Sequence, residues 1–205
     1  MMAFLPGMGL NGRVNAMRYV LLAALLFLPL EAGASAPPDW QAQLVTELVW
    51  MERALLEASY FSALAVMAPT VVDQRILAQR VVNILEGRGG PHFDPRLAEE
   101  EELPGVLPRL QALALALAEE DPPPPERETL RFTFANVNAF LTLARELALR
   151  GASTHHLLRG AISLRQAYAC LLAALGPEDE EFAYLGGIRS LLARYRPLAE
   201  PPTSP

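Results

Sequence analysis

Few side chains here could bind a metal or act in catalysis, because the chain contains three histidines and one cysteine. His92 and Asp94 lie two residues apart in segment 87–102, which is rich in glycine, proline and acidic residues. An imidazole and a carboxylate placed so close together could bind a metal ion or a small polar ligand. This segment is therefore the first candidate site, with His92 and Asp94 as its candidate ligand-binding residues.

The other two histidines, His155 and His156, are neighbours where a helix is expected to begin. Neighbouring helical residues point about 100° apart, so these two cannot share a metal as residues four apart would. We expect both side chains to be solvated near the helix start, with a metal or haem role as the alternative.

A second candidate site lies between two expected helices, residues 126–150 and 154–175. Asn136 falls beside the apolar seam of the first helix, so we expect it to be buried and bonded to a neighbouring helix. A buried asparagine more often fixes helix register than binds a ligand. The alternative is a ligand pocket near Asn136 and Tyr168, whereas Asn138 falls on the outward stripe.

No catalytic constellation can be identified. The Glu-x-x-His pairs of di-iron bundles and the Cys-x-x-Cys-His of c-type haem are both missing from the sequence. The glycine-rich run 87–90 leaves an expected helix rather than entering one, so it is not a phosphate-binding loop. The acidic runs 99–102, 119–121 and 178–181 lack the alternating oxygens of a calcium loop. The sequence predicts no enzymatic activity, no metal and no cofactor.

Residues 19–30 form an apolar run that basic residues precede and small residues follow. This order is typical of a secretory signal peptide, and the run is shorter than the ~20 apolar residues that span a bilayer. We expect residues 1–34 to be a signal peptide cleaved after Ala34, with Met17 as an alternative start. An uncleaved N-terminal anchor is the alternative. Either way, the protein would be extracytoplasmic: periplasmic, secreted or held in the cell envelope.

The composition is that of an acidic chain without a basic cluster. Its net charge is −6 at pH 7 and its pI is about 5.1. Such a surface disfavours nucleic acid and anionic membranes as partners. The single cysteine, Cys170, excludes an internal disulfide and lies within an apolar helical pattern. We expect it to behave as a small buried hydrophobe, with an intermolecular disulfide or a reactive thiol as the alternative.

Apolar residues recur at helical spacing along most of the chain, with glycine and proline mostly between the apolar segments. Thr70 and Asp73 resemble a capping box, and Gly87 is expected to end the helix that they begin. Prolines 122–125 are expected to form a stiff connector. The patterns together predict helices at residues 40–67, 70–86, 105–120, 126–150, 154–175 and 178–195.

The strongest apolar pattern belongs to the helices at 126–150 and 154–175. Gly151 is expected to end the first helix, and Ser153 or Thr154 to cap the second. Two helices joined by so short a loop must lie antiparallel, with their apolar seams in contact.

These elements predict an all-α, up-and-down antiparallel helical bundle of about four long helices plus one or two shorter ones. The sequence contains no apparent internal repeat. We expect residues 35–196 to form a single domain and residues 197–205 to form a flexible, proline-rich tail.

One stretch of the chain resembles a segment of uncharacterised exported helical proteins of bacteria. It comprises residues 78–87, Ala-Gln-Arg-Val-Val-Asn-Ile-Leu-Glu-Gly, and residues 90–94, Gly-Pro-His-Phe-Asp. In those proteins the helix tends to read His-Ala-Glu-His-hydrophobic-hydrophobic-Asn-Ile-Ile-Glu-Gly, and an Asp-rich, calcium-like loop often follows. Here Leu77 and Arg80 stand at the histidine positions, and a proline-flanked segment replaces the Asp-x-Asp-Gly loop. These departures put a metal function in doubt for this chain.

The resemblance implies structural roles for three residues. Gly87 would form a left-handed helix end, and Asn83 and Glu86 would tie the following loop down. Asn83 and Glu86 therefore join His92 and Asp94 as candidate ligand-binding residues of the loop.

Two functional hypotheses follow. The first is an exported helical bundle with a structural, interaction or accessory role in the cell envelope. Its partner would be another envelope protein or a second copy of itself, with membrane contact only through an uncleaved signal segment. The alternative is a bundle that binds a small ligand or a metal, at the 87–102 segment or at the pocket near Asn136 and Tyr168.

Overall fold

A computed structural model describes residues 39–98, 104–177 and 186–199 of the chain. The predicted signal peptide, the acidic runs 99–102 and 178–181 and the end of the tail lie outside these residues. The described helices all belong to one unit, residues 37–205, and none of them is long and apolar enough to cross a membrane.

The described part of the chain is all-α, as predicted, and contains no strand. A short 3₁₀ helix, η1 (Pro95–Leu97), lies in the loop after the second helix. The α-helices are α2 (Asp39–Val66), α3 (Val71–Glu86), α4 (Val106–Glu120), α5 (Pro124–Ser153), α6 (Leu157–Leu175) and α7 (Ile188–Ala199).

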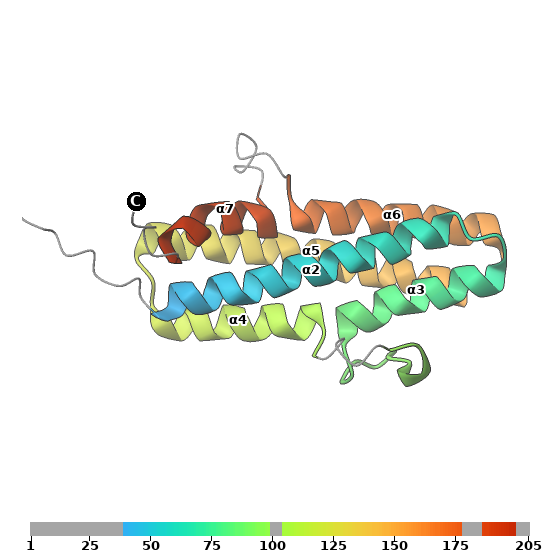
Figure 1. Ribbon diagram of the computed structural model, residues 1–205, viewed down its shortest axis with the longest axis horizontal. Coiled ribbons are helices and arrows are strands. Elements are labelled where there is room, and N and C mark those ends of the chain that lie inside the picture. Colours follow the sequence, from blue (N-terminus) through green and yellow to red (C-terminus); the bar gives the residue numbers. More distant parts are fainter. Residues whose placement is uncertain (1–38, 99–103, 178–185, 200–205) are drawn as a thin grey trace, which may run out of the picture. The chain divides into compact units, whose positions relative to one another are not determined.

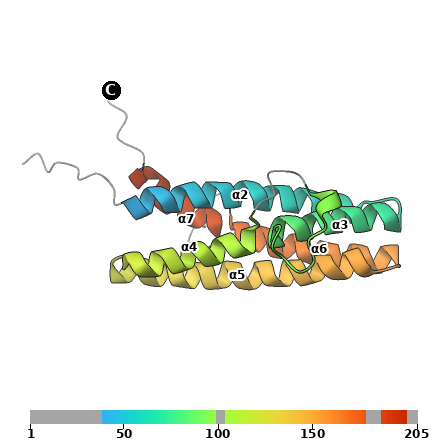
Figure 2. The same cartoon turned by 90° about the horizontal axis from the view of Figure 1, so that it is seen from below.

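The helices form a bundle with four corners. One long helix occupies each of two corners, and two shorter successive helices occupy each of the other two, which we call the split corners (Figure 1). α2 and α5 run the length of the bundle in the same direction, at opposite corners (Figures 1 and 2). α3 and then α4 occupy the third corner, and α6 and then α7 occupy the fourth, all antiparallel to the long helices. The bundle thus consists of two helical hairpins of the same design, each with one long arm and one split arm.

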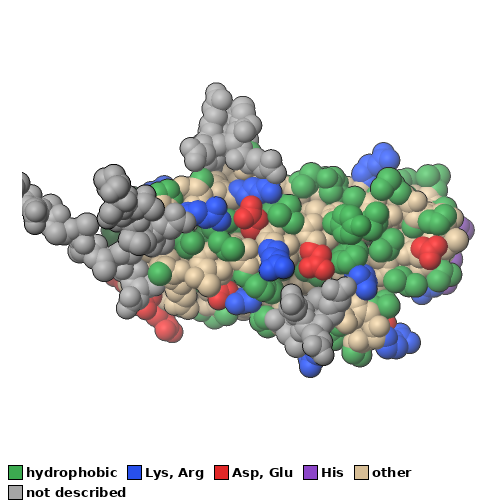
Figure 3. Space-filling view, viewed as in Figure 1, with side chains coloured by type: hydrophobic (Ala, Val, Ile, Leu, Met, Phe, Trp, Pro, Cys, Tyr) green, Lys and Arg blue, Asp and Glu red, His purple; other side chains and the backbone are tan. Residues whose placement is uncertain are grey.

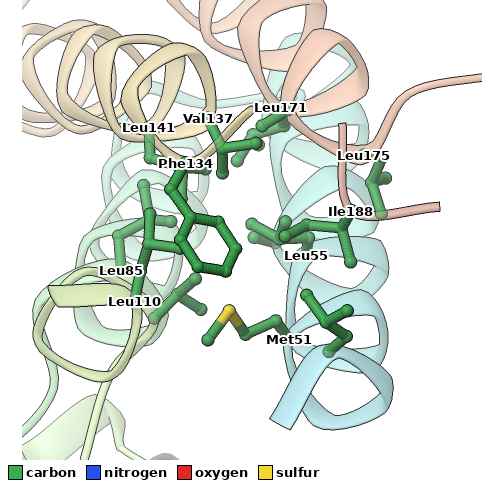
Figure 4. Packing of buried hydrophobic residues seen from close by; sticks show 14 of the residues in the cluster. Met51, Leu55, Leu85, Leu110, Phe134, Val137, Leu141, Leu171, Leu175 and Ile188 are labelled. Carbon is green, nitrogen blue, oxygen red and sulfur yellow. The ribbon is translucent and has the colours of Figure 1, made fainter. Parts of the chain in front are cut away.

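The buried positions of the two long arms correspond. Eight of the eleven buried positions in α2 are matched by a buried position 86 residues later in α5, as Leu44 is by Leu130. The exceptions are Trp40, Gln41 and Ser59. In both arms small buried residues, such as Ala65 and Gly151, become more frequent toward the end. Figure 4 shows the large side chains, among them Met51 and Phe134, meeting between the helices. The repeat lies in burial and size rather than in residue identity, which is why the sequence does not reveal it. The matched pairs include Leu48 with Phe134, Met51 with Val137, Leu55 with Leu141 and Ala58 with Ala144.

Two glycines are in contact at each split corner, Gly87 with Gly105 and Gly176 with Gly187. Gly87 ends α3 with φ 68° and ψ 178°, and Gly176 ends α6 with the similar values 81° and 173°. A β-carbon on Gly87 would collide with the backbone of Pro104 and Gly105, where the chain returns to begin α4. Only glycine combines a positive φ with so close an approach of two backbones. The prediction that Gly87 ends its helix is confirmed.

The prediction that Gly151 ends its helix is wrong. Gly151 lies inside α5, which continues to Ser153 and is capped by Thr154. A β-carbon at Gly151 would lie 2.8 Å from Cγ of Leu164 on α6, so this glycine serves close helix packing. The expected cap of the next helix is also wrong, because His156 occupies the N-cap position and Thr154 Oγ1 accepts a hydrogen bond from its N–H.

Two further boundaries differ from expectation. The prediction of one continuous helix at 178–195 is wrong, since Gly186 and Gly187 have positive φ and α7 begins at Ile188; residues 178–185 lie outside the described residues. α7 also continues through Pro197, beyond the expected domain end at 196. Pro124 and Pro125 form the first turn of α5, where missing N–H groups cost nothing, so the connector is shorter than predicted.

The remaining titratable side chains lie close to where the sequence placed them. His155 and His156 are exposed, as expected. Cys170 is half-buried beside the main core, and burial raises the pKa of its thiol. A raised pKa leaves little thiolate at neutral pH, which makes the side chain a poor nucleophile.

Candidate functional site

Asn83, in the last turn of α3, holds the following loop by its side chain. Its Nδ2 donates to the carbonyl of Asp94 at 2.8 Å, and the N–H of Asp94 donates to Asn83 Oδ1 at 2.9 Å. Gln79 Nε2 donates to the same Oδ1 at 3.1 Å. The fully buried amide therefore replaces a backbone partner for a residue eleven positions later, as the resemblance implied.

Glu86 holds the loop at a second point. It is only 3% exposed, and its Oε2 accepts from the N–H of His92 at 2.8 Å. Its Oε1 lies 2.9 Å from His92 Nδ1 and 3.8 Å from Arg145 Nε. Gly90 lets the loop pass, because a β-carbon there would lie 2.6 Å from Glu86 Oε2. These contacts compensate the cost of burying a carboxylate.

Asp94 closes this arrangement at the 3₁₀ helix. Its carboxylate accepts from the N–H of Arg96 at 3.0 Å and from Arg96 Nε and Nη2 at 2.9 and 2.7 Å. These hydrogen bonds lower the pKa of Asp94 to about 2. We call residues 87–98, held by Asn83 and Glu86, the tethered loop. The structure thus brings together all four loop candidates. Each takes part in a contact that holds the loop, Asn83 with Asp94 and Glu86 with His92.

No group of three or more histidine, cysteine, aspartate or glutamate side chains that could hold a metal occurs among the described residues. The His92 ring is half-exposed and already contacts Glu86. The geometry of the described tethered loop therefore favours a structural role over metal binding.

The second predicted site is not assembled. Asn136 is exposed, so the expectation that it is buried and bonded to a neighbouring helix is wrong. It lies on an outward stripe of α5 with Phe132 and Phe140, which are 69% and 40% exposed. Because Gly151 contacts Leu164 and the helices are antiparallel, half-buried Tyr168 lies level with residues near position 147 of α5. That is ~16 Å along the helix from Asn136 at 1.5 Å per residue.

The structure shows a pocket that the sequence did not indicate, between α4 and α5. Its volume is about 610 Å³. The lining is mainly apolar, from Leu110, Ala114 and Leu117 of α4 and Leu130 and Phe134 of α5. This pocket adjoins a second one, described next, and we call it the apolar half of the groove that the two form together.

A second pocket, of about 720 Å³, continues the first toward the tethered loop. It is lined by Glu86, Arg88, Thr142 and Arg145, among others, and we call it the polar half. The two pockets share Gln111 and Asn138 in their linings, so they adjoin along α5, and we call the two together the groove. The groove therefore borders the tethered loop at Glu86.

Charged side chains link α4 to both of its neighbours. Arg109 of α4 donates from Nε and Nη2 to Glu47 Oε2 and Oε1 of α2 at 2.6 and 3.1 Å. Its guanidinium also lies 4.1 Å from the ring centroid of Trp50. On the α5 side, Arg127 contacts Asp121 at the C-cap of α4.

The corresponding interface between the two hairpins, that of α7 with α2, is filled. Trp40 packs edge-to-face on the buried Tyr195 with centroids 5.9 Å apart, and Arg189 pairs with Glu52 at 2.9 Å. In the 86-residue correspondence, Glu126 takes the place of Trp40, and Asn138 takes the place of Glu52. The groove thus exists at the α4–α5 interface, which lacks counterparts of the aromatic pair and the ion pair that close the α2–α7 interface.

Among the described residues, some charged side chains of the groove have an ion-pair or hydrogen-bond partner and others do not. At the apolar half, Arg127 contacts Asp121 and donates to the carbonyl of Pro122 at 3.1 Å. Arg131 makes no ion pair or hydrogen bond to the described residues. Arg145 Nε is buried and has no hydrogen-bond partner among them. The groove therefore offers an apolar floor together with arginines able to accept a further partner.

Comparison with family models, with curated proteins and with solved structures finds no significant match to this chain.

Proposed function

We propose that this protein is an exported helical-bundle binding protein with an accessory role in the cell envelope, and that it holds a small, elongated ligand in the α4–α5 groove. The observation that carries the proposal is the open, apolar interface between α4 and α5. A volume of about 610 Å³ lies in the usual range for small-molecule sites, and such sites are mainly apolar with a few polar groups. Export remains a prediction from residues 1–34.

The proposal can be tested with the neutral fluorescent probe N-phenyl-1-naphthylamine and the purified protein. We expect the probe to bind, and Ala114→Phe, which fills the apolar half, to abolish binding. Ala112→Phe is the matched control, because Ala112 is exposed on the same helix and is not among the lining residues. Equal binding by the two variants, or none by the unaltered protein, would overturn the proposal.

A second candidate function, interaction with another copy of the chain, is favoured by a separate observation. Hydrophobic side chains gather over α2 and α6 on one face of the bundle (Figure 3). The exposed hydrophobic residues of these two helices include Tyr60 of α2 and Ile162 of α6, which are 60% and 54% exposed. Sedimentation velocity would test this candidate: a dimer that Tyr60→Arg or Ile162→Arg converts to a monomer supports it, and a monomeric unaltered protein excludes it.

A further inference from the structure

We propose that the ligand of the groove is a single-chain amphipathic anion, with its tail in the apolar half and a carboxylate or phosphate head in the polar half, at Arg145 and Arg88. This inference rests on the proposed function, because it names the chemical class of ligand for the same groove.

The first step is the shape of the groove. Its apolar floor begins at Leu130 and its polar half extends to Arg145 on the same helix. Fifteen residues of α5 separate them, which corresponds to ~22 Å at 1.5 Å per residue. Gln111 and Asn138 lie where the two halves meet. A long, narrow site with one apolar end and one polar end is complementary to an extended amphiphile.

The second step is the unmet hydrogen-bonding capacity of Arg145. Its Nε is buried without a hydrogen-bond partner, and its nearest carboxylate oxygen, Glu86 Oε1, is 3.8 Å away. The Arg145 side chain as a whole is 29% exposed and lines the polar half, so the accessible part of its guanidinium, rather than Nε, is available to a head group. An anionic oxygen is the strongest acceptor for a guanidinium.

The third step concerns Glu86, the one carboxylate that lines the polar half. Both of its oxygens already contact His92, through the N–H at 2.8 Å and Nδ1 at 2.9 Å, and the side chain is almost completely buried. Its charge is thus directed into the tethered loop. The exposed Arg88 lines the same half and makes no ion pair or hydrogen bond to the described residues.

The fourth step is the balance of charge along the whole groove. Asp121 is paired with Arg127, and Glu86 faces Arg145. Two further lining arginines, Arg88 and Arg131, have no acidic partner among the described residues. The groove is therefore positive on a chain whose net charge is −6, which favours an anion over a cation.

The test compares four ligands with the same twelve-carbon tail, each below its micelle concentration: dodecanoate, dodecyl phosphate, dodecanol and dodecyltrimethylammonium. Affinities are obtained by displacement of N-phenyl-1-naphthylamine. We expect both anions to bind roughly tenfold or more tightly than dodecanol, in line with a charge-assisted hydrogen bond. The order of the two anions tells whether a fatty-acid carboxylate or a lipid phosphate is the better head group.

Variants assign the head group to its site. Arg145→Gln is expected to lose roughly tenfold in affinity for dodecanoate and to keep its affinity for dodecanol. Unchanged dodecanol binding also shows that this variant is folded. Arg150→Gln is the matched control, because Arg150 is an exposed arginine of α5 that is not among the lining residues. It should bind dodecanoate as the unaltered protein does.

The outcomes separate this inference from the proposed function. If dodecanol binds as tightly as the anions, or the ammonium binds most tightly, the anionic head group is wrong while the groove remains a binding site. If Arg145→Gln does not weaken dodecanoate, the assignment to Arg145 is wrong. If none of the four ligands displaces the probe and the probe itself does not bind, the proposed function fails.

Discussion

The side chain of Asn83 and the backbone of Asp94 are joined by two hydrogen bonds of 2.8 and 2.9 Å, one in each direction. This is the pairing that a neighbouring strand would give to a peptide group, supplied here by a helix side chain. Because Asn83 is fully buried, its amide cannot exchange this contact for water. The start of the 3₁₀ helix is therefore fixed to the last turn of α3.

Replacing Asn83 by alanine should destabilise the protein. The N–H and carbonyl of Asp94 would lose their partners, and we expect the free energy of unfolding to fall by about 2–3 kcal/mol. Urea unfolding measures this change. Asn136→Ala is the matched control, because Asn136 is an exposed helical asparagine, and it should gain up to about 0.7 kcal/mol from helix propensity. Similar effects of the two substitutions would contradict the role of Asn83.

The effect of Gly151→Ala on the free energy of unfolding should change sign when Leu164 is replaced by alanine. Gly151→Ala gains about 1 kcal/mol of helix propensity but places a β-carbon 2.8 Å from Leu164 Cγ, which should cost about 1–3 kcal/mol. We expect net destabilisation in the native background and stabilisation in a Leu164→Ala background. A double-mutant cycle by urea unfolding checks this coupling. The same sign in both backgrounds would show that Gly151 is not there for packing.

The interaction of Asp94 with Arg96 should appear in the acid range of stability. The pKa of Asp94 is lowered from 3.8 to about 2, chiefly by hydrogen bonding to Arg96. A lowered carboxyl pKa adds stability that is complete above the unfolded-state pKa and is lost as pH falls through the folded-state value. We expect a loss of stability between about pH 4 and pH 2 that Arg96→Gln lacks.

The same prediction has a direct readout. An NMR titration of the Asp94 carboxyl carbon should give a pKa of about 2 in the native protein and a higher value in Arg96→Gln. Arg96 is 85% exposed, so added salt should also raise the pKa. An unperturbed pKa in the native protein would contradict the pairing.

Replacing Arg109 by lysine should loosen α4. Lysine offers one ammonium group in place of the fork that binds both oxygens of Glu47, and it stacks less well on Trp50. We expect faster amide hydrogen exchange across 106–120 and a loss of about 1 kcal/mol in the free energy of unfolding. Arg159→Lys, on an exposed position of α6, is the control. Unchanged exchange in α4 would mean that Arg109 does not hold this helix.

Much of the fold could be predicted because burial in a bundle follows helical periodicity. The apolar spacing at 126–150 predicted a buried face for this helix, and Leu130, Phe134 and Val137 on that face are all buried. Gly151 was misinterpreted because a glycine that ends a helix and a glycine that admits a neighbouring helix look the same in sequence. The two differ in the structure: Gly87 has a positive φ against the returning backbone, whereas Gly151 is helical and packs against Leu164.

The candidate site was less predictable. The tethered loop could be anticipated because Asn83 and Glu86 stand near the residues that they hold. The groove depends instead on side chains that are missing from an interface, namely counterparts of Trp40 and Glu52 on α5. Recognising that loss requires the correspondence between the two hairpins, which is preserved in burial and not in residue identity.

The glycine contacts at the split corners also have an evolutionary consequence. Because the chain leaves the bundle at Gly87 and rejoins it in contact with the same residue at Gly105, the intervening segment spans almost no distance. The same holds for Gly176 and Gly187. The distance between the two ends therefore sets no minimum length for either connecting segment, although Asn83 and Glu86 hold residues 92–94 of the first one. Both corners can accept new sequence, and one of them adjoins the groove, so specificity can diversify there while the scaffold is inherited unchanged.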